Sequence, residues 1–184
     1  MNYSGIKTHD VANGVGVRVS LFVSGCTHRC KGCFNAETWD FDFGNPFTEV
    51  EEAQIINALA PGYIKGFSLL GGEPFEPQNQ RVLTPFLKKI KETYPDKTIW
   101  CYSGYLYDTE LLGESRAKCE VTEEMLSYID VLVDGEFHEA EKNLNLKFRG
   151  SENQRIIDVP ASLQSGDVVL VKEFMEVKGV KQHG

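Results

Sequence analysis

The sequence lacks any apolar stretch long enough to cross a bilayer, because polar or charged residues interrupt each one well before about 18 residues. The first residues, Met1-Asn2-Tyr3-Ser4-Gly5, lack the basic and then apolar segments of a secretory signal. Basic residues are also in deficit, with 19 Lys and Arg against 27 Asp and Glu and a net charge of −8. This charge disfavours binding to a nucleic-acid backbone. We therefore expect a cytoplasmic protein that binds neither nucleic acid nor membrane.

Cysteine is scarce, and its five copies cannot all pair within the chain because the number is odd. Three of them lie within the eight residues 26–33, a distribution typical of a metal site rather than of a disulfide scaffold. The length of 184 residues favours one compact domain. The content of 41% hydrophobic and 25% charged residues is typical of an ordinary soluble globule.

Strand-like and helix-like segments alternate along the first 135 residues or so. β-Branched and apolar runs predict strands over 17–23, 66–70, 98–102 and 129–133. Between the first two strands we expect a helix that begins at the capping box of Thr48 and Glu51. A second helix is expected from Pro85 to Tyr94, with Thr84 as its cap. Residues 108–128 are expected to be mostly helical, with a last short helix that begins at Thr122. Helix-sized crossovers imply parallel strands and an α/β fold.

The signal weakens beyond residue 140. Residues 155–159 and 168–171 could be two further strands, forming a hairpin about the Ser165-Gly166-Asp167 turn. We therefore expect one domain over 1–159 and a C-terminal extension over 160–184 that could add a strand or hairpin to it.

The unusual residues all follow the C-terminal end of a predicted strand. The cysteines follow the first, Gly71-Gly72-Glu73-Pro74 the second, Ser103-Gly104-Tyr105 the third and Asp134-Gly135 the fourth. Parallel α/β folds bind ligands at this edge of the sheet. The four loops are thus expected to converge on one site.

The first of these loops has the spacing C-x3-C-x2-C, formed by Cys26, Cys30 and Cys33. Three thiolates can each bind one iron of a [4Fe–4S] cube, which leaves the fourth iron open to a ligand. A structural zinc site with His28 as the fourth ligand and a chance group of buried cysteines are the alternatives. Cys101 is expected in the core, and Cys119 has no assignable role.

The cysteine spacing, followed by an aromatic residue at the end of a first strand, resembles the radical S-adenosylmethionine (SAM) superfamily. The resemblance implies a partial, open (βα) barrel with parallel strands. It also implies that SAM chelates the open iron and is cleaved to methionine and a 5′-deoxyadenosyl radical.

Within that superfamily, about residues 1–158 resemble the activating enzymes of anaerobic (class III) ribonucleotide reductase. Several segments carry the resemblance: Val11-Ala12-Asn13-Gly14, Leu21–Cys26, Gly71–Pro74, Val131–Gly135 and Arg149-Gly150-Ser151. Phe34, Val15 and Glu73 stand where tyrosine, proline and aspartate, respectively, are commoner or frequent. Residues 108–120 and the tail from about Pro160 exceed the family pattern.

The resemblance implies roles for the residues of the four loops. Glu73 would lie near the ammonium group of SAM, and Ser103 and Asp134 near its ribose or the rim of the site. No protein acid, base or nucleophile is implied. The cluster would be held by Cys26, Cys30 and Cys33, and SAM by Gly32, Cys33, Phe34, Gly71, Gly72, Glu73, Ser103 and Asp134.

The implied activity is the formation of a glycyl radical on anaerobic ribonucleoside-triphosphate reductase. The implied partners are the large catalytic subunit of that reductase and a low-potential electron donor such as flavodoxin. Two alternatives within the superfamily are an activase of the pyruvate formate-lyase type and a small-molecule enzyme such as 7-carboxy-7-deazaguanine synthase. A metal-binding or electron-transfer module is the alternative that is not an enzyme.

Overall fold

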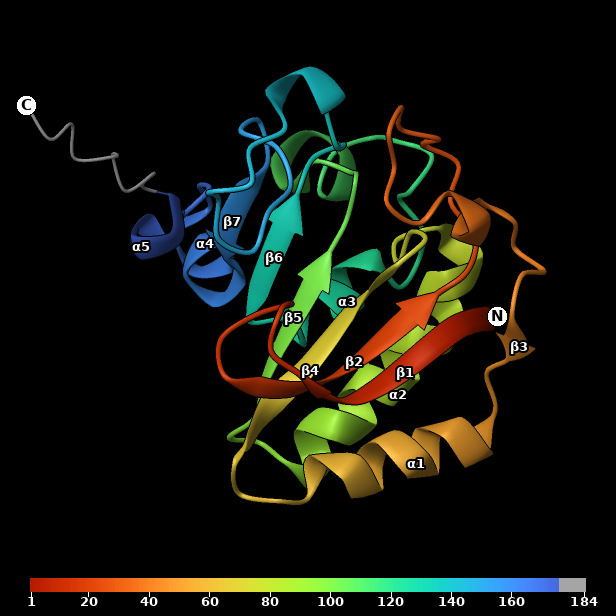
Figure 1. Cartoon of the computed structure of the whole chain (residues 1–184). Coiled ribbons are helices and arrows are strands. Elements are labelled where there is room, and N and C mark those ends of the chain that lie inside the picture. Colours follow the sequence, from red (N-terminus) through yellow and green to blue (C-terminus); the bar gives the residue numbers. More distant parts are fainter. Residues whose placement is uncertain (176–184) are drawn as a thin grey trace, which may run out of the picture.

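The computed structural model describes residues 1–175, which form a mixed sheet with helices packed against it (Figure 1). The strands are β1 (Asn2–Asp10), β2 (Val17–Val23), β3 (Asn45–Pro46), β4 (Ile64–Gly71), β5 (Thr98–Tyr102), β6 (Val131–Asp134) and β7 (Arg155–Asp158). The helices are α1 (Glu49–Leu59), α2 (Pro77–Thr93), α3 (Thr122–Ser127), α4 (Val159–Ser165) and α5 (Lys172–Met175). Three shorter turns are η1 (Ala36–Trp39), η2 (Tyr107–Leu111) and η3 (Glu139–Glu141). No helix among these residues is long and apolar enough to span a membrane.

The strand order is β3-β1-β2-β4-β5-β6-β7. The central strands β2, β4, β5 and β6 are parallel, while β1, β3 and β7 pair antiparallel at the two edges. The predicted α/β class and parallel pairing are confirmed as a mixed α/β fold with an open sheet. Strand β1 was not expected from the sequence, because its residues are half exposed and interrupted by Gly5.

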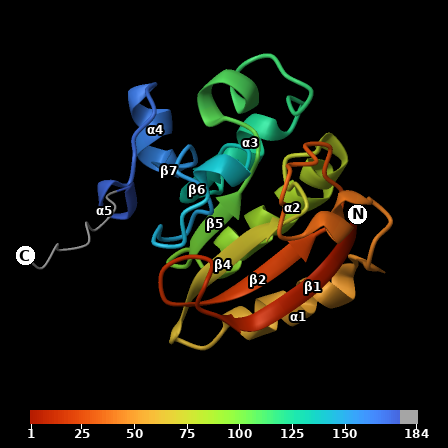
Figure 2. The same ribbon diagram turned by 45° about the horizontal axis from the view of Figure 1, so that its top comes forward.

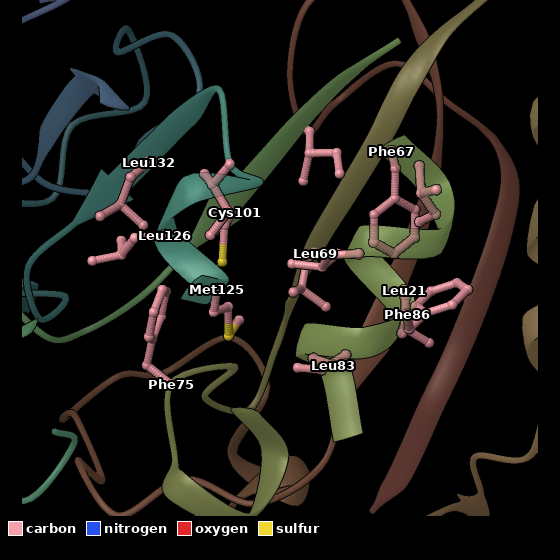
Figure 3. Close-up of a cluster of buried hydrophobic side chains, with 14 of the residues drawn as sticks. Leu21, Phe67, Leu69, Phe75, Leu83, Phe86, Cys101, Met125, Leu126 and Leu132 are labelled. Atoms are coloured by element: carbon pink, nitrogen blue, oxygen red, sulfur yellow. The ribbon is translucent and has the colours of Figure 1, made fainter. Parts of the chain in front are cut away.

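The main core lies between one face of the sheet and helices α1, α2 and α3 (Figures 1 and 2). Helix α2 presents Leu83, Phe86, Leu87 and Ile90 to it, at the spacing of one helical face. Apolar side chains from the strands meet them, and Cys101 of β5 lies among these with Leu132 and Met125 (Figure 3). The prediction that Cys101 is a core residue is therefore confirmed.

The opposite face of the parallel strands is polar near the start of β2. The Arg18 side chain is buried, and its Nε donates to Ser68 Oγ at 2.7 Å while its Nη2 donates to the Phe67 and Thr98 carbonyls, each at 2.8 Å. Burial lowers the pKa of Arg18 to about 10, so it stays charged at neutral pH. Ser68 Oγ in turn donates to the Asn13 carbonyl at 2.5 Å. This network fixes the connection between β1 and β2 on that face.

One of the first two predicted helices differs in the structure. Helix α1 opens at the predicted Thr48 capping box, but α2 begins at Pro77, and Pro85 lies inside it. The burial of a continuous apolar face offsets the missing amide at Pro85, and Thr84 Oγ1 donates to the Gln80 carbonyl rather than capping a helix.

The expectation of mostly helical structure over 108–128 is wrong for residues 112–121. These residues form bends and turns between η2 and α3, although the short helix at Thr122 is confirmed. Ser115 Oγ donates to the Glu110 carbonyl at 2.8 Å and accepts from the Ala117 amide at 3.1 Å. Such side-chain bonds compete with helical main-chain bonds.

The predicted C-terminal hairpin is confirmed only in part. Residues 155–158 form a strand as expected, but α4 follows at once, because the Asp158 carboxylate accepts from the Ala161 amide at 3.0 Å and Pro160 occupies the first turn. Leu170 forms an antiparallel bridge to Ile157. The Asp158 amide donates to the Val169 carbonyl and the Val171 amide donates to the Ile156 carbonyl, each at 2.8 Å, so this segment does return beside β7. The rest of the predicted extension, 176–184, lies outside the described residues, and a domain boundary at 159/160 stays a prediction.

Candidate functional site

The loops after the parallel strands meet around one cavity of about 540 Å³. Its lining includes the predicted residues Cys26, Cys30, Cys33, Phe34, Gly71, Gly72, Glu73 and Ser103. From the fourth loop, Gly135 lines the cavity, whereas the predicted residues Gly32 and Asp134 do not. The C-terminal edge of the parallel strands therefore gathers the predicted site, as its topology requires.

The cysteine loop wraps tightly because two of its residues adopt left-handed backbone conformations. Arg29 has a φ of 54° and Gly32 a φ of 74°. The Cys33 amide donates to the Cys30 carbonyl at 3.1 Å, and the Asn35 amide donates to Cys33 Sγ at 3.4 Å. The loop thus turns back on itself and directs an amide at one of its sulfurs, a contact that tunes iron–sulfur clusters.

Cys26, Cys30 and Cys33 are free, half-buried thiols that line the cavity. Burial, and after it the charge of Glu73, raises the pKa of Cys26 to about 12, and burial also raises the pKa of Cys30. These thiols therefore keep their protons at neutral pH until a metal displaces them. Among residues 1–175 no three His, Cys, Asp or Glu side chains converge as they would on one metal ion.

Gly71 and Gly72 bring the second loop against the first. The Gly72 amide donates to the Val23 carbonyl at 2.7 Å, and the Glu73 amide donates to the Gly25 carbonyl at 2.8 Å. A Cβ on Gly71, whose φ is 116°, would lie 2.5 Å from the Val23 nitrogen, and a Cβ on Gly72 would lie 2.6 Å from the Gly25 oxygen. Only glycine fits at both positions, because the opposing atoms are backbone.

The Glu73 carboxylate is buried and accepts four hydrogen bonds. Oε1 accepts from the Phe75 amide at 2.8 Å and from Ser103 Oγ at 2.9 Å. Oε2 accepts from the Gly104 amide at 2.7 Å and lies 3.1 Å from His28 Nε2. Glu73 therefore joins the loops that follow β2, β4 and β5.

His28 bridges two carboxylates, with Nε2 on Glu73 and Nδ1 2.7 Å from Glu136 Oε1. Burial lowers the pKa of His28, but hydrogen bonds and charges from Glu73 and Glu136 outweigh it, so the pKa is raised overall. In the protonated form of the ring both nitrogens can donate, and the two carboxylates favour that form. The sequence pattern considered His28 as a zinc ligand and gave no sign of this bridge.

Asp134 is fully buried beside the site. Its carboxylate accepts from Arg155 Nε at 2.9 Å, from Arg155 Nη2 at 2.5 Å and from the Tyr107 amide at 2.8 Å. Asp134 therefore ties β6 to β7 and to η2. The ribose contact expected from the resemblance would have to compete with this ion pair.

Several lining residues were not expected from the sequence. The cavity is also lined by Asn13, Trp39, Tyr102 and a segment within 143–148 that includes Phe148. Tyr102 could have been found from strand alternation, since Cys101 faces the core. The others come from loops whose paths depend on long-range contacts, so no local sequence signal marks them.

Comparisons with known proteins assign the family. Residues 12–157 match the family model described as a 4Fe-4S single cluster domain. The chain is similar to anaerobic ribonucleoside-triphosphate reductase-activating proteins of Haemophilus influenzae (48% identity over 158 residues, 85% of this chain and 97% of the relative), Escherichia coli K12 (44% over 156 residues, 84% and 96%) and Enterobacteria phage T4 (40% over 159 residues, 85% and 93%). The protein thus carries a 4Fe–4S domain and belongs to the family of anaerobic ribonucleoside-triphosphate reductase-activating proteins.

Proposed function

We propose that this protein binds SAM at a [4Fe–4S] cluster held by Cys26, Cys30 and Cys33, and that it forms a glycyl radical on anaerobic ribonucleoside-triphosphate reductase. The observation that carries the proposal is the meeting of the three cysteines with Gly71, Gly72 and Glu73 on one cavity. Family membership supports the partner and the reaction, because the relatives are named for activating that reductase. An activase of another glycyl-radical enzyme is the second candidate.

The chemistry belongs to the cofactors, and the chain supplies binding and orientation. Cys26, Cys30 and Cys33 would hold the cluster, which would supply the one-electron reduction of SAM and thereby the hydrogen-atom abstraction from a glycine of the partner. Gly32, Cys33 and Phe34 would contact SAM from the cysteine loop, and Gly71 and Gly72 from the second loop.

Glu73 would accept the ammonium group of SAM. Its carboxylate is already held by main-chain amides of Phe75 and Gly104 and by Ser103, which fix its orientation. The remaining partner is the His28 ring, and the ammonium group of SAM could take its place on Oε2. Ser103 would then link the ammonium site to the ribose side of the cavity, and Asp134 would lie behind it.

Finer features of the proposal rest on the resemblance. The open sheet would be a partial radical SAM barrel, whose missing side admits the glycine segment of the reductase's large catalytic subunit. The domain would span residues 1–159, with 160–184 as an extension. A low-potential donor such as flavodoxin would reduce the cluster in the cytoplasm.

The experiment is anaerobic reconstitution with iron and sulfide, followed by addition of SAM and a strong reductant. The wild-type protein and Cys119→Ser, which alters a cysteine away from the cavity, are expected to release 5′-deoxyadenosine and methionine. Cys30→Ala is expected to release neither, because the cluster loses one of three ligands. Full turnover by Cys30→Ala, or a protein that retains zinc and no iron, would refute the proposal.

A further inference from the structure

Buried donors without partners gather at the cavity. Seven buried side-chain nitrogen or oxygen atoms among residues 1–175 have no hydrogen-bond partner: Ser24 Oγ, Trp39 Nε1, Asn79 Oδ1, Tyr102 Oη, Tyr107 Oη, Arg149 Nε and Asn153 Oδ1. Three of them, on Trp39, Tyr102 and Arg149, belong to residues that line the cavity. All three can donate a hydrogen bond, and Trp and Arg can only donate. These three unpartnered donors would be satisfied by a ligand that presents hydrogen-bond acceptor oxygens.

Tyr102 is the donor whose position is best determined by the fold. It is the last residue of β5, where Cys101 faces the helices, so the Tyr102 side chain points to the opposite face of the sheet. Phe22 of β2 pairs with Leu70 of β4, and Leu69 pairs with Cys101, which places Tyr102 beside Leu70. Phe22, Leu70 and Tyr102 all line the cavity. The Tyr102 hydroxyl is thus a polar group on an otherwise apolar row.

Among residues 1–175 the Tyr102 hydroxyl has no hydrogen-bond partner. Arg18 and Asp10 are the charged groups that face it, but Arg18 donates to Ser68, Thr98, Val15 and Phe67, and Asp10 accepts from Ser20, Asn13 and Ala12. Burial raises the pKa of Tyr102, so the hydroxyl remains a neutral donor. Burying an unpaired hydroxyl is unfavourable, which a ligand would correct.

We propose that Tyr102 is a positioning residue whose hydroxyl donates a hydrogen bond to an acceptor oxygen of a ligand bound in the cavity. This inference rests on the proposed function, which supplies two ligands with such oxygens. One is SAM, through its carboxylate or ribose, and the other is a main-chain carbonyl of the partner's glycine segment. Tyr102 precedes Ser103, whose hydroxyl donates to Glu73, so both residues lie at the C-terminal end of β5.

The test compares Tyr102→Phe with Tyr107→Phe. Tyr107 is the matched control, because its hydroxyl is also buried without a partner but it does not line the cavity. Neither substitution removes a bond from the ligand-free protein, so both variants are expected to unfold in urea at a concentration equal to or above the wild-type value. SAM affinity of the reconstituted proteins is then measured by equilibrium dialysis. The concentration of reductase large subunit that gives half-maximal glycyl radical is measured by electron paramagnetic resonance.

Tyr102→Phe is expected to weaken one of these two interactions about three- to tenfold, the effect of losing one neutral hydrogen bond, while Tyr107→Phe matches wild type. Weaker SAM binding identifies SAM as the acceptor, and a change confined to the reductase titration identifies the partner. Identical behaviour of the two variants in both assays would overturn the inference. If wild type and Tyr107→Phe themselves neither bind SAM nor form the radical, the proposed function fails instead.

Discussion

Gly72→Ala is expected to destabilise the protein where the two central loops touch. The added Cβ would lie 2.6 Å from the Gly25 oxygen and 2.9 Å from the Thr38 oxygen. Both are backbone atoms that cannot rotate away, so the loops must separate by at least about 0.4 Å to reach a tolerable contact. This movement strains the 2.8 Å bond from the Glu73 amide to the Gly25 carbonyl, directly before Cys26.

The expected cost has two contributions. Overpacking against backbone costs about 1–3 kcal/mol, and weakening one buried hydrogen bond costs about 1 kcal/mol more. We therefore expect Gly72→Ala to lower the free energy of unfolding by about 2–4 kcal/mol. Urea denaturation of the protein before cluster reconstitution measures this loss. Iron content after reconstitution should fall too, because the displaced segment leads into the cysteine loop.

Gly62→Ala is the matched control, since a Cβ at Gly62 would meet nothing within 4 Å. It is expected to leave stability unchanged or to raise it by up to about 1 kcal/mol through a less flexible unfolded chain. If Gly72→Ala unfolds at the same urea concentration as Gly62→Ala and binds as much iron, the close packing of the two loops is not what positions the cysteines.

Three further predictions concern stability. Asp10→Asn should cost about 1–3 kcal/mol at pH 7, because its carboxylate accepts from Ser20, Asn13 and the Ala12 amide. Burial raises the pKa of Asp10, but these hydrogen bonds outweigh it and lower the pKa below 3.8. The stabilisation is therefore present above pH 3.8 and is lost as pH falls through the folded-state pKa. Urea denaturation in acid should show the stabilities of the variant and wild type converging, and a constant difference would contradict this. Asp134→Asn should lower the free energy of unfolding of the ligand-free protein by about 3 kcal/mol, because it leaves Arg155 without its buried ionic partner. Wild-type stability together with weakened SAM binding would favour the ribose role instead. Thr48→Ala should cost about 1 kcal/mol in thermal or urea unfolding, because it removes the capping box of α1, and an unchanged midpoint would show that this end of the helix does not limit stability.

The parts of the fold that were predictable are those whose local signal agrees with their packing. Strands β2, β4 and β5 have β-branched or apolar runs, and the Thr48 capping box fixes the start of α1. The start of α2 was missed because Pro85 resembles a first-turn proline, whereas burial of a longer apolar face decides the helix. A helix interrupts the expected hairpin because Asp158 and Pro160 open α4 directly after β7.

The candidate site was predictable as a set of loops but not as a set of contacts. Parallel topology places the cysteines, Gly71–Glu73 and Ser103 together, and local spacing was enough to select them. The Asp134–Arg155 ion pair and the His28 bridge join residues 21 and 108 positions apart, so no local pattern reveals them. The lining by Trp39 and residues 143–150 likewise depends on how distant loops fold back.

The activity proposed for this protein is the formation of a radical on a glycine of a partner reductase. The most direct measurement mixes the reconstituted protein, SAM and a reductant with the large subunit of anaerobic ribonucleoside-triphosphate reductase, without oxygen, and records the electron paramagnetic resonance spectrum. We predict a glycyl radical doublet on the reductase that requires SAM and is absent with Cys30→Ala. A protein that cleaves SAM yet yields no doublet on the reductase, or yields one only on a pyruvate formate-lyase, would contradict the account.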